Sequence, residues 1–99
     1  MIDNKLLEYL IVFYKEGSLL KASEVLHLSE PSLSKAMKSL EDEFGLNIFD
    51  RKKNKLSLNE DGLKLLPFIN EVINSDRILV KKAQEIKEKR NKISIGYTA

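Results

Sequence analysis

The sequence predicts a mainly α-helical fold, a winged helix-turn-helix with a two-stranded β wing followed by a long dimerising linker helix. Three patterns indicate this fold. Apolar residues recur at helical spacing in the first part of the chain, alternating apolar and polar residues follow from residue 46, and a heptad pattern continues over residues 65–86. With 99 residues, the chain is long enough for one small domain.

The first helix is expected from about Asn4 to Glu16, where leucines and aromatic residues recur at helical spacing. Gly17 should end it, because glycine accepts the left-handed conformation that follows a helix C-cap. Ser18 is a suitable N-cap for a short second helix that includes residues 21–26.

A turn at residues 27–29 leads into a third helix, which Ser29 can cap and which accepts Pro31 in its first turn. One face carries an apolar stripe, made of Leu33, Met37, Leu40 and Phe44. The opposite face is polar and carries Glu30, Ser32, Ser34, Lys35 and Lys38. Gly45 is expected to close this helix as Gly17 closes the first.

The period-two stretch predicts two short strands joined by residues 52–55, a hairpin with a basic tip. The basic side chains of this run are Arg51, Lys52, Lys53 and Lys55. Taken alone, a charge run is more often a solvated loop than a binding site. Clustered charge can nevertheless attract phosphate where the total charge cannot, and the net charge here is only +2.

Asn59 is expected to cap a long fourth helix over residues 60–88, bent at Pro67. Its heptad positions are interrupted only by Asp76. We expect the first turns to pack inward through Leu63, Leu66 and Phe68. We expect a second copy to contact the dimerisation residues Leu65, Ile69, Val72, Leu79, Ala83 and Ile86.

These elements divide the chain into three parts. Residues 1–58 are the predicted winged helix-turn-helix domain, and residues 59–89 are the linker and dimerisation helix. Residues 90–99 are expected to form a hinge and the first strand of a truncated further domain, because residues 93–97 alternate like a strand but have no partner here.

Several functional classes are disfavoured by composition. The absence of cysteine excludes disulfides and thiolate metal sites, and His27 is the only histidine. No nucleophile–base pair or glycine-rich phosphate loop is visible, so no enzyme, metal or cofactor is predicted. No apolar run reaches the roughly 20 residues of a membrane span, and the N-terminus lacks the order of a secretory signal, so a cytoplasmic location is expected.

The third helix and the hairpin together favour double-stranded DNA as the partner. Short polar side chains at a helix N-terminus can reach base edges in a major groove. The predicted base-reading residues are Glu30, Pro31, Ser32, Ser34 and Lys35. The predicted phosphate contacts, which position the domain without reading sequence, are Ser18, Lys21, Lys38, Arg51, Lys53 and Lys55.

The order of these residues resembles the LysR-type transcriptional regulators, from about Leu6 to the end of the chain. The densest match is Gly17-Ser18, Ala22-Ser23 and residues 27–35. It continues through Leu40-Glu41, Gly45-Leu46, Phe49-Asp50-Arg51 and residues 58–62. Each motif is weak alone, but the full order and spacing are specific.

The resemblance implies a bacterial winged helix-turn-helix, a linker helix that dimerises, and a missing C-terminal domain that binds a small-molecule effector. It further implies a dimer that reads an interrupted inverted repeat, and a tetramer of the full-length protein stays open. Family members mostly carry glutamine in place of Glu30, arginine in place of Lys35 and threonine in place of Asn59.

Two alternatives remain. The first is a winged helix that pairs with protein, which the balanced charge of residues 1–58, nine basic and nine acidic side chains, would suit. The basic hairpin and the short polar residues of the third helix speak against it. The second is a small enzyme, for which no reactive constellation is visible.

Overall fold

The computed structural model describes the backbone of residues 3–98 and the side chains of residues 3–90. Three helices come first: α1 (Asn4–Glu16), α2 (Leu19–Leu26) and α3 (Glu30–Phe44). An antiparallel hairpin follows, formed by β1 (Phe49–Lys52) and β2 (Lys55–Leu58), and then the long helix α4 (Glu60–Thr98). The predicted fold class is confirmed.

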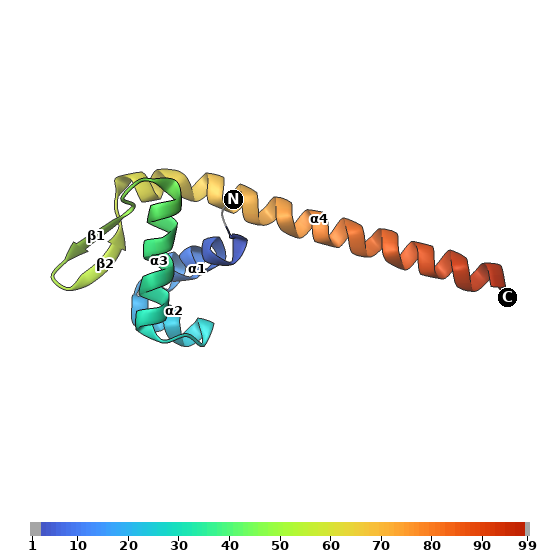
Figure 1. Ribbon diagram of the computed structural model, residues 1–99, viewed down its shortest axis with the longest axis horizontal. Helices are drawn as coiled ribbons and strands as arrows, with labels where there is room; N and C mark the ends of the chain where they lie inside the picture. The colour runs from blue at the N-terminus through green and yellow to red at the C-terminus, as the bar shows by residue number, and fades with distance from the viewer. Residues whose placement is uncertain (1–2, 99) are drawn as a thin grey trace.

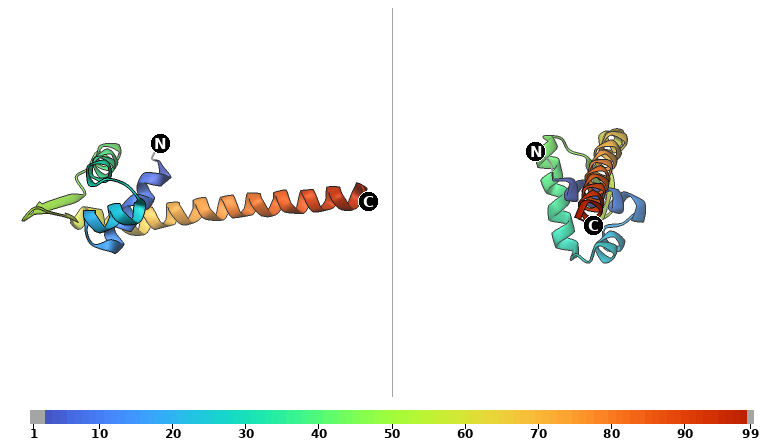
Figure 2. Two further views of the ribbon diagram at one scale, coloured as in Figure 1. Left: turned by 90° about the horizontal axis from the view of Figure 1, so that it is seen from below. Right: turned by 90° about the vertical axis from the view of Figure 1, so that its right-hand side faces the viewer.

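The molecule has two parts: a head made of α1, α2, α3, the hairpin and the first turns of α4, and a shaft made of the rest of α4. Figure 1 shows α1, α2, α3 and the first turns of α4 gathered at one end, with the rest of α4 extending away from them. The overall extents are 67 × 25 × 20 Å. The left view of Figure 2 shows that the wing, β1 and β2 with their turn, lies at the end opposite to the free end of α4.

Local capping explains where the three short helices begin and end. Gly17 and Gly45 take left-handed conformations, with φ of 81° and 65°, after α1 and α3. The Oγ atoms of Ser18 and Ser29 accept hydrogen bonds from backbone N–H groups of the first turns of α2 and α3. Because Ser18 caps directly, α2 begins at Leu19, two residues before the segment predicted from sequence.

The core lies between α1, α3 and the start of α4. The apolar stripe predicted on α3 is confirmed, since Leu33, Met37 and Leu40 are at most 1% exposed and Phe44 is half-buried. The other buried apolar residues are Leu7, Leu10, Phe13, Ala22, Ile48, Leu66, Ile69 and Ile73. Together they fix the direction in which α3 presents its opposite, polar face.

The face of α4 that packs on the core differs from the predicted one. Leu66 faces inward as expected, but Leu63 and Phe68 are 46% and 64% exposed. Ile69, expected at the dimer seam, is 4% exposed in the core of its own domain, and Leu65 is partly buried against that core. The core-facing positions 62, 66, 69 and 73 lie about 100° around the helix from Val72, Leu79 and Ile86.

The C-terminal part of the chain also differs from the expectation. The helix continues through Pro67 and then to Thr98, so neither the hinge expected near residue 90 nor a strand at residues 93–97 is present. A strand leaves its N–H and C=O groups unpaired unless a neighbouring strand accepts them, whereas a helix pairs its own. Among the described residues, strand pairing is confined to β1 and β2. A helix is therefore the conformation in which this segment can pair its own backbone groups.

The wing is a tight hairpin. Lys52 pairs with Lys55, and the two residues between them, Lys53 and Asn54, have φ of 53° and 61°. Positive φ at both central residues is what the type I′ turn, one of the two favoured two-residue hairpin turns, requires. At the base of the hairpin, the ring of Phe49 packs edge-on against Phe13 with centroids 5.7 Å apart, which joins the wing to α1.

Candidate nucleic-acid interface

The N-terminal end of α3 presents the predicted base-reading residues to solvent. Glu30, Pro31, Ser32 and Lys35 are exposed, and Ser34 is half-buried. The buried stripe on the other side of the helix holds them outward. A free helix N-terminus also carries unpaired N–H groups and a partial positive charge, both of which favour phosphate.

A groove joins the start of α3 to the wing. It is lined by Ser18, Leu19, Leu20, Glu30, Arg51, Lys53, Asn54, Lys55 and Leu56. Five of the predicted DNA-contact residues therefore meet in one place although they come from α2, α3 and the hairpin. Glu30 is the acid of this groove, beside three cations of the wing.

A second groove runs between α3 and β1. It is lined by Ser34, Met37, Lys38, Glu41, Asn47, Phe49, Asp50, Arg51, Leu56 and Asn59. Arg51 and Leu56 line both grooves, so the two are continuous along the wing. Four predicted residues line neither groove and lie on the exposed surface beside them: Lys21, Pro31, Ser32 and Lys35.

The hydroxyl groups of Ser18 and Ser32 can still donate a hydrogen bond to a phosphate. Ser18 Oγ accepts the Lys21 N–H over 3.1 Å, and this leaves its own hydroxyl hydrogen free for another acceptor. Ser32 Oγ accepts from Ser29 Oγ over 2.8 Å and likewise keeps a hydrogen to donate. The predicted roles of Ser18 and Ser32 are therefore compatible with the hydrogen bonds that these two side chains make within the chain.

The cations of the interface are weakly engaged. Lys38 Nζ lies 3.7 Å from Asp42 Oδ1, but both side chains are more than 60% exposed, so this pair contributes little and can open. Among the side chains that the structure describes, none of the three ion pairs involves Arg51, Lys53 or Lys55. These three charges are available to an external anion.

Asn54 and Glu41, two residues of these grooves, are missing from the site predicted from the sequence. Asn54 lines the wing groove, and its amide can donate to a phosphate or accept from a donor. Glu41 belongs to a run of three acidic residues, 41–43, yet it is half-buried, and its Oε2 accepts the N–H groups of Ile48 and Phe49 over 2.8 and 3.2 Å. These bonds depend on how the chain turns back after Gly45, which local patterns do not report.

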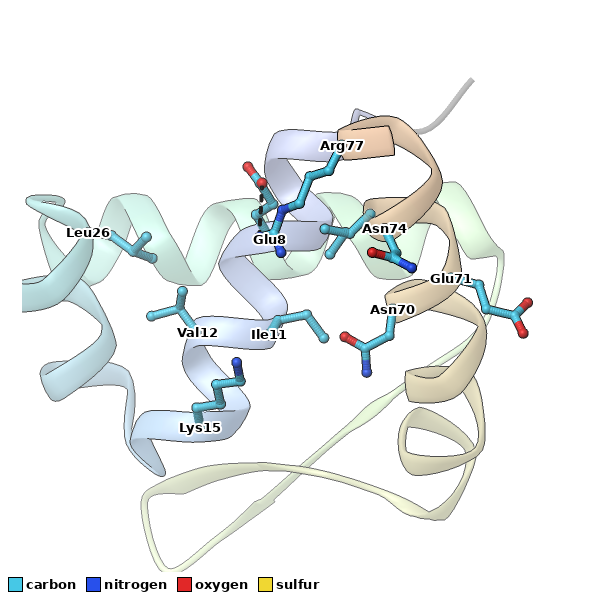
Figure 3. Close-up of a pocket in the computed structure, with 10 residues that line it drawn as sticks. Glu8, Ile11, Val12, Lys15, Leu26, Asn70, Glu71, Asn74 and Arg77 are labelled. Atoms are coloured by element: carbon cyan, nitrogen blue, oxygen red, sulfur yellow. Dashed lines mark ion pairs between the residues drawn. The ribbon is translucent and has the colours of Figure 1, made fainter. Parts of the chain in front are cut away.

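A further groove lies between α1 and α4, away from the wing (Figure 3). Its apolar lining is made of Ile11, Val12, Leu26 and Ile73, while Glu8 and Arg77 form an exposed ion pair of 3.9 Å across it. It contains none of the predicted DNA-contact residues and carries both signs of charge, so it is a poor site for nucleic acid.

The shaft carries an apolar stripe that its own head does not cover. Val72, Leu79 and Ile86 are 47%, 68% and 60% exposed, and Ala83 lies on the same side. Among residues 3–90, no group of three His, Asp or Glu side chains could hold a metal ion. Within the described backbone, no helix is both long and apolar enough to cross a membrane.

Known proteins resemble this chain in sequence and fold. Residues 4–63 match the sequence profile described as "Bacterial regulatory helix-turn-helix protein, lysR family". The chain is 33% identical over 99 residues to the HTH-type transcriptional regulator BsdA of Bacillus subtilis, a match that covers 98% of this chain and 34% of that protein. The chain thus spans about a third of the length of the curated relatives it matches.

Solved structures also resemble this chain in fold. Full-length OxyR from Pseudomonas aeruginosa is 29% identical with a TM-score of 0.78, covering 86% of this chain and 29% of that one. The DNA-binding domain of CbnR, solved in complex with DNA, has a TM-score of 0.79 at 20% identity, covering 86% of this chain and 98% of that one. At that identity the second likeness supports the fold alone.

Proposed function

Because the chain belongs to the lysR family of bacterial regulatory helix-turn-helix proteins, we propose that it binds double-stranded DNA sequence-specifically and regulates transcription. In this proposal α3 enters the major groove and the wing follows the phosphate backbone. The observation that carries it is the groove in which Ser18, Glu30 and the wing cations meet. Three segments distant in sequence there form one surface, with three basic side chains and one acidic one, beside an exposed helix N-terminus.

The chemistry of α3 suits base edges. Glu30 accepts from the exocyclic amino group of cytosine, and Lys35 donates to guanine. Ser32 and Ser34 can donate or accept at several bases, while the ring of Pro31 offers an apolar contact to a thymine methyl. These five residues are our proposed base-reading set.

The remaining contacts are proposed to go to phosphates. Their members are Ser18, Lys21, Lys38, Arg51, Lys53 and Lys55, to which the structure adds Asn54 as a candidate. Such contacts fix the register of the protein on the duplex and make binding depend strongly on salt.

Dimerisation is proposed through the exposed stripe of α4, made of Val72, Leu79, Ala83 and Ile86. Val72 is exposed beside the last core residue of α4, Ile73, and the other three lie beyond it, so their own head does not cover them. A pair of α4 helices would hold the two heads at a fixed distance. Each head would then bind one half-site of an interrupted inverted repeat. Tetramer formation and effector binding by a further C-terminal domain are proposals for the whole protein, carried over from the family.

The test is a fluorescence anisotropy titration against the duplex upstream of the gene and a scrambled duplex, each at two salt concentrations. Tight, salt-sensitive binding that prefers the upstream duplex, and is lost in Lys35→Ala, would support the proposal. Salt-sensitive binding without preference would leave only the phosphate contacts. No binding at low salt by a folded protein would favour the alternative of a protein-interaction module.

A further inference from the structure

We propose that Glu41 is a positioning residue for DNA binding, which fixes the wing at a set angle to α3 so that both reach one duplex together. The proposal rests on the DNA-binding function proposed above. Glu41 itself is assigned no contact with DNA. It acts through the wing, by holding the backbone where β1 begins.

The first observation is the pair of hydrogen bonds at the root of the wing. Oε2 of Glu41 accepts the N–H of Ile48 over 2.8 Å and the N–H of Phe49 over 3.2 Å. Phe49 is the first residue of β1, and the Ile48 side chain is fully buried. Bonds to a carboxylate are stronger than those between neutral groups, and a partly buried N–H without a partner is costly.

The second observation is that the root is also held from the other side. The N–H of Asn59 donates to the Ile48 carbonyl over 2.9 Å, and its side-chain Nδ2 donates to the Asn47 carbonyl over 2.9 Å. Residues 47–49 are thus held between α3 and the start of α4. Without the Glu41 carboxylate, the hydrogen bonds to Asn59 would remain and the side-chain hydrogen bonds from α3 would be lost.

The third observation is the face of α3 on which Glu41 lies. Ser34, Lys38 and Glu41 are spaced by four and three residues and line the same groove beside the wing. The face that offers Ser34 to a base at one end therefore holds the wing at the other. This carboxylate, together with the packing of Ile48 and Phe49, therefore helps to set the distance between the base-reading residues and the wing cations.

Positioning and charge predict opposite effects on affinity. An acid near the interface repels phosphates, so removing its charge alone should strengthen binding. Loss of positioning should instead weaken it. Glu43 supplies the matched control, because it is an exposed acid on the same helix, two residues away, and no hydrogen bond or ion pair involves it among the described side chains.

The experiment compares the Kd for duplex DNA of the wild type with those of Glu41→Ala, Glu41→Gln, Glu41→Asp and Glu43→Ala, over a range of salt. We expect Glu41→Ala to bind about tenfold more weakly and with a shallower salt slope, because wing phosphate contacts are lost. Glu41→Gln keeps an acceptor oxygen at the same reach and should bind like the wild type or more tightly. Glu43→Ala should do the same.

Glu41→Asp separates geometry from charge and replaces Glu41→Ala if that variant does not fold. It keeps the charge but is one methylene shorter, so we expect weakened binding. Adding Lys53→Ala gives a further readout. If Glu41 positions the wing, Lys53→Ala should weaken binding less in a Glu41→Ala background than in the wild type, which is a non-additive result.

A readout without DNA completes the design. Hydrogen exchange at the Ile48 and Phe49 amides should accelerate in Glu41→Ala and stay slow in Glu41→Gln and Glu43→Ala. Unchanged exchange, or Glu41→Ala binding as tightly as Glu43→Ala while the wild type binds normally, would overturn the positioning role alone. A folded wild type that binds no duplex would overturn the DNA-binding function, and the positioning role with it.

Discussion

The backbone N–H of Asn59 donates to the carbonyl of Ile48 over 2.9 Å, so the residue that follows the wing is bonded to the residue that precedes it. Asn59 also caps α4, with its Oδ1 accepting the Gly62 N–H over 2.8 Å. The start of the shaft and the root of the wing are therefore one structural unit. The predictions below begin at that unit and move outward.

Replacement of Gly62 should destabilise the head. A Cβ at this position would lie 2.5 Å from the Ile48 carbonyl oxygen and 2.8 Å from Leu58 Cδ2, and the first of these is backbone that cannot turn away. Gly→Ala inside a helix normally stabilises by roughly 0.5–1 kcal/mol. We expect Gly62→Ala instead to lower the free energy of unfolding by about 1–3 kcal/mol. Urea denaturation measures it, with exposed Lys64→Ala as control; a stabilised Gly62→Ala would contradict the close packing.

Removal of a wing cation should weaken binding without altering sequence preference. Lys53 is exposed, belongs to none of the ion pairs among the described side chains, and lines the groove beside α3. We expect Lys53→Ala to raise the Kd for every duplex by a similar factor and to reduce the salt slope by about one unit. Salt-dependent anisotropy measures both, and Lys89→Ala on the outer shaft is the control. A changed base preference would mean that Lys53 reads sequence.

Glu30 should set the preference at one base pair. A carboxylate only accepts, which suits the amino group of cytosine, whereas a carboxamide accepts and donates and suits adenine. We therefore expect Glu30→Gln to shift preference from cytosine to adenine at a single operator position, by about tenfold or more. Competition among single-base variants of the bound duplex measures the shift. Glu43→Gln makes the same chemical change away from the groove, and a shift there too would argue for a general charge effect.

A charge placed in the apolar stripe of the shaft should separate the two copies. Leu79 is 68% exposed and lies on the stripe, while its neighbour Val80 is 62% exposed but about 100° around the helix. We expect Leu79→Glu to sediment as a monomer at concentrations where the wild type and Val80→Glu are dimers. Binding to an inverted repeat should weaken while binding to one half-site is retained. A dimeric Leu79→Glu would place the interface elsewhere.

Much of the head could be predicted because its signals are local. The glycines after α1 and α3, the serines before α2 and α3, and the apolar stripe of α3 each act within a few residues. The basic run of the hairpin was visible for the same reason. The meeting of these basic residues with Ser18 and Glu30 in one groove depends on the order in which the helices and the hairpin follow one another.

What escaped prediction depends on contacts between distant segments. Both Ile69 and Val72 fit a heptad, and only the docking of α4 on α1 decides that Ile69 turns inward. The role of Glu41 depends on where the chain returns after Gly45. The alternation of residues 93–97 favours a strand, yet strand pairing needs a neighbour that the chain does not place there, and α4 continues instead.

If α4 pairs with a second copy as proposed, its reach beyond Ile73 makes the order of the shaft depend on protein concentration. The head has a core of its own, whereas the outer turns have only their backbone hydrogen bonds and exposed ion pairs unless the proposed second chain covers Leu79 and Ile86. Most helical stability in proteins comes from the packing of an apolar face, so order in these turns would be linked to the proposed assembly by mass action. Dilution should therefore unravel the shaft while leaving the head intact, and the spacing between two heads would exist only when enough protein is present to define it.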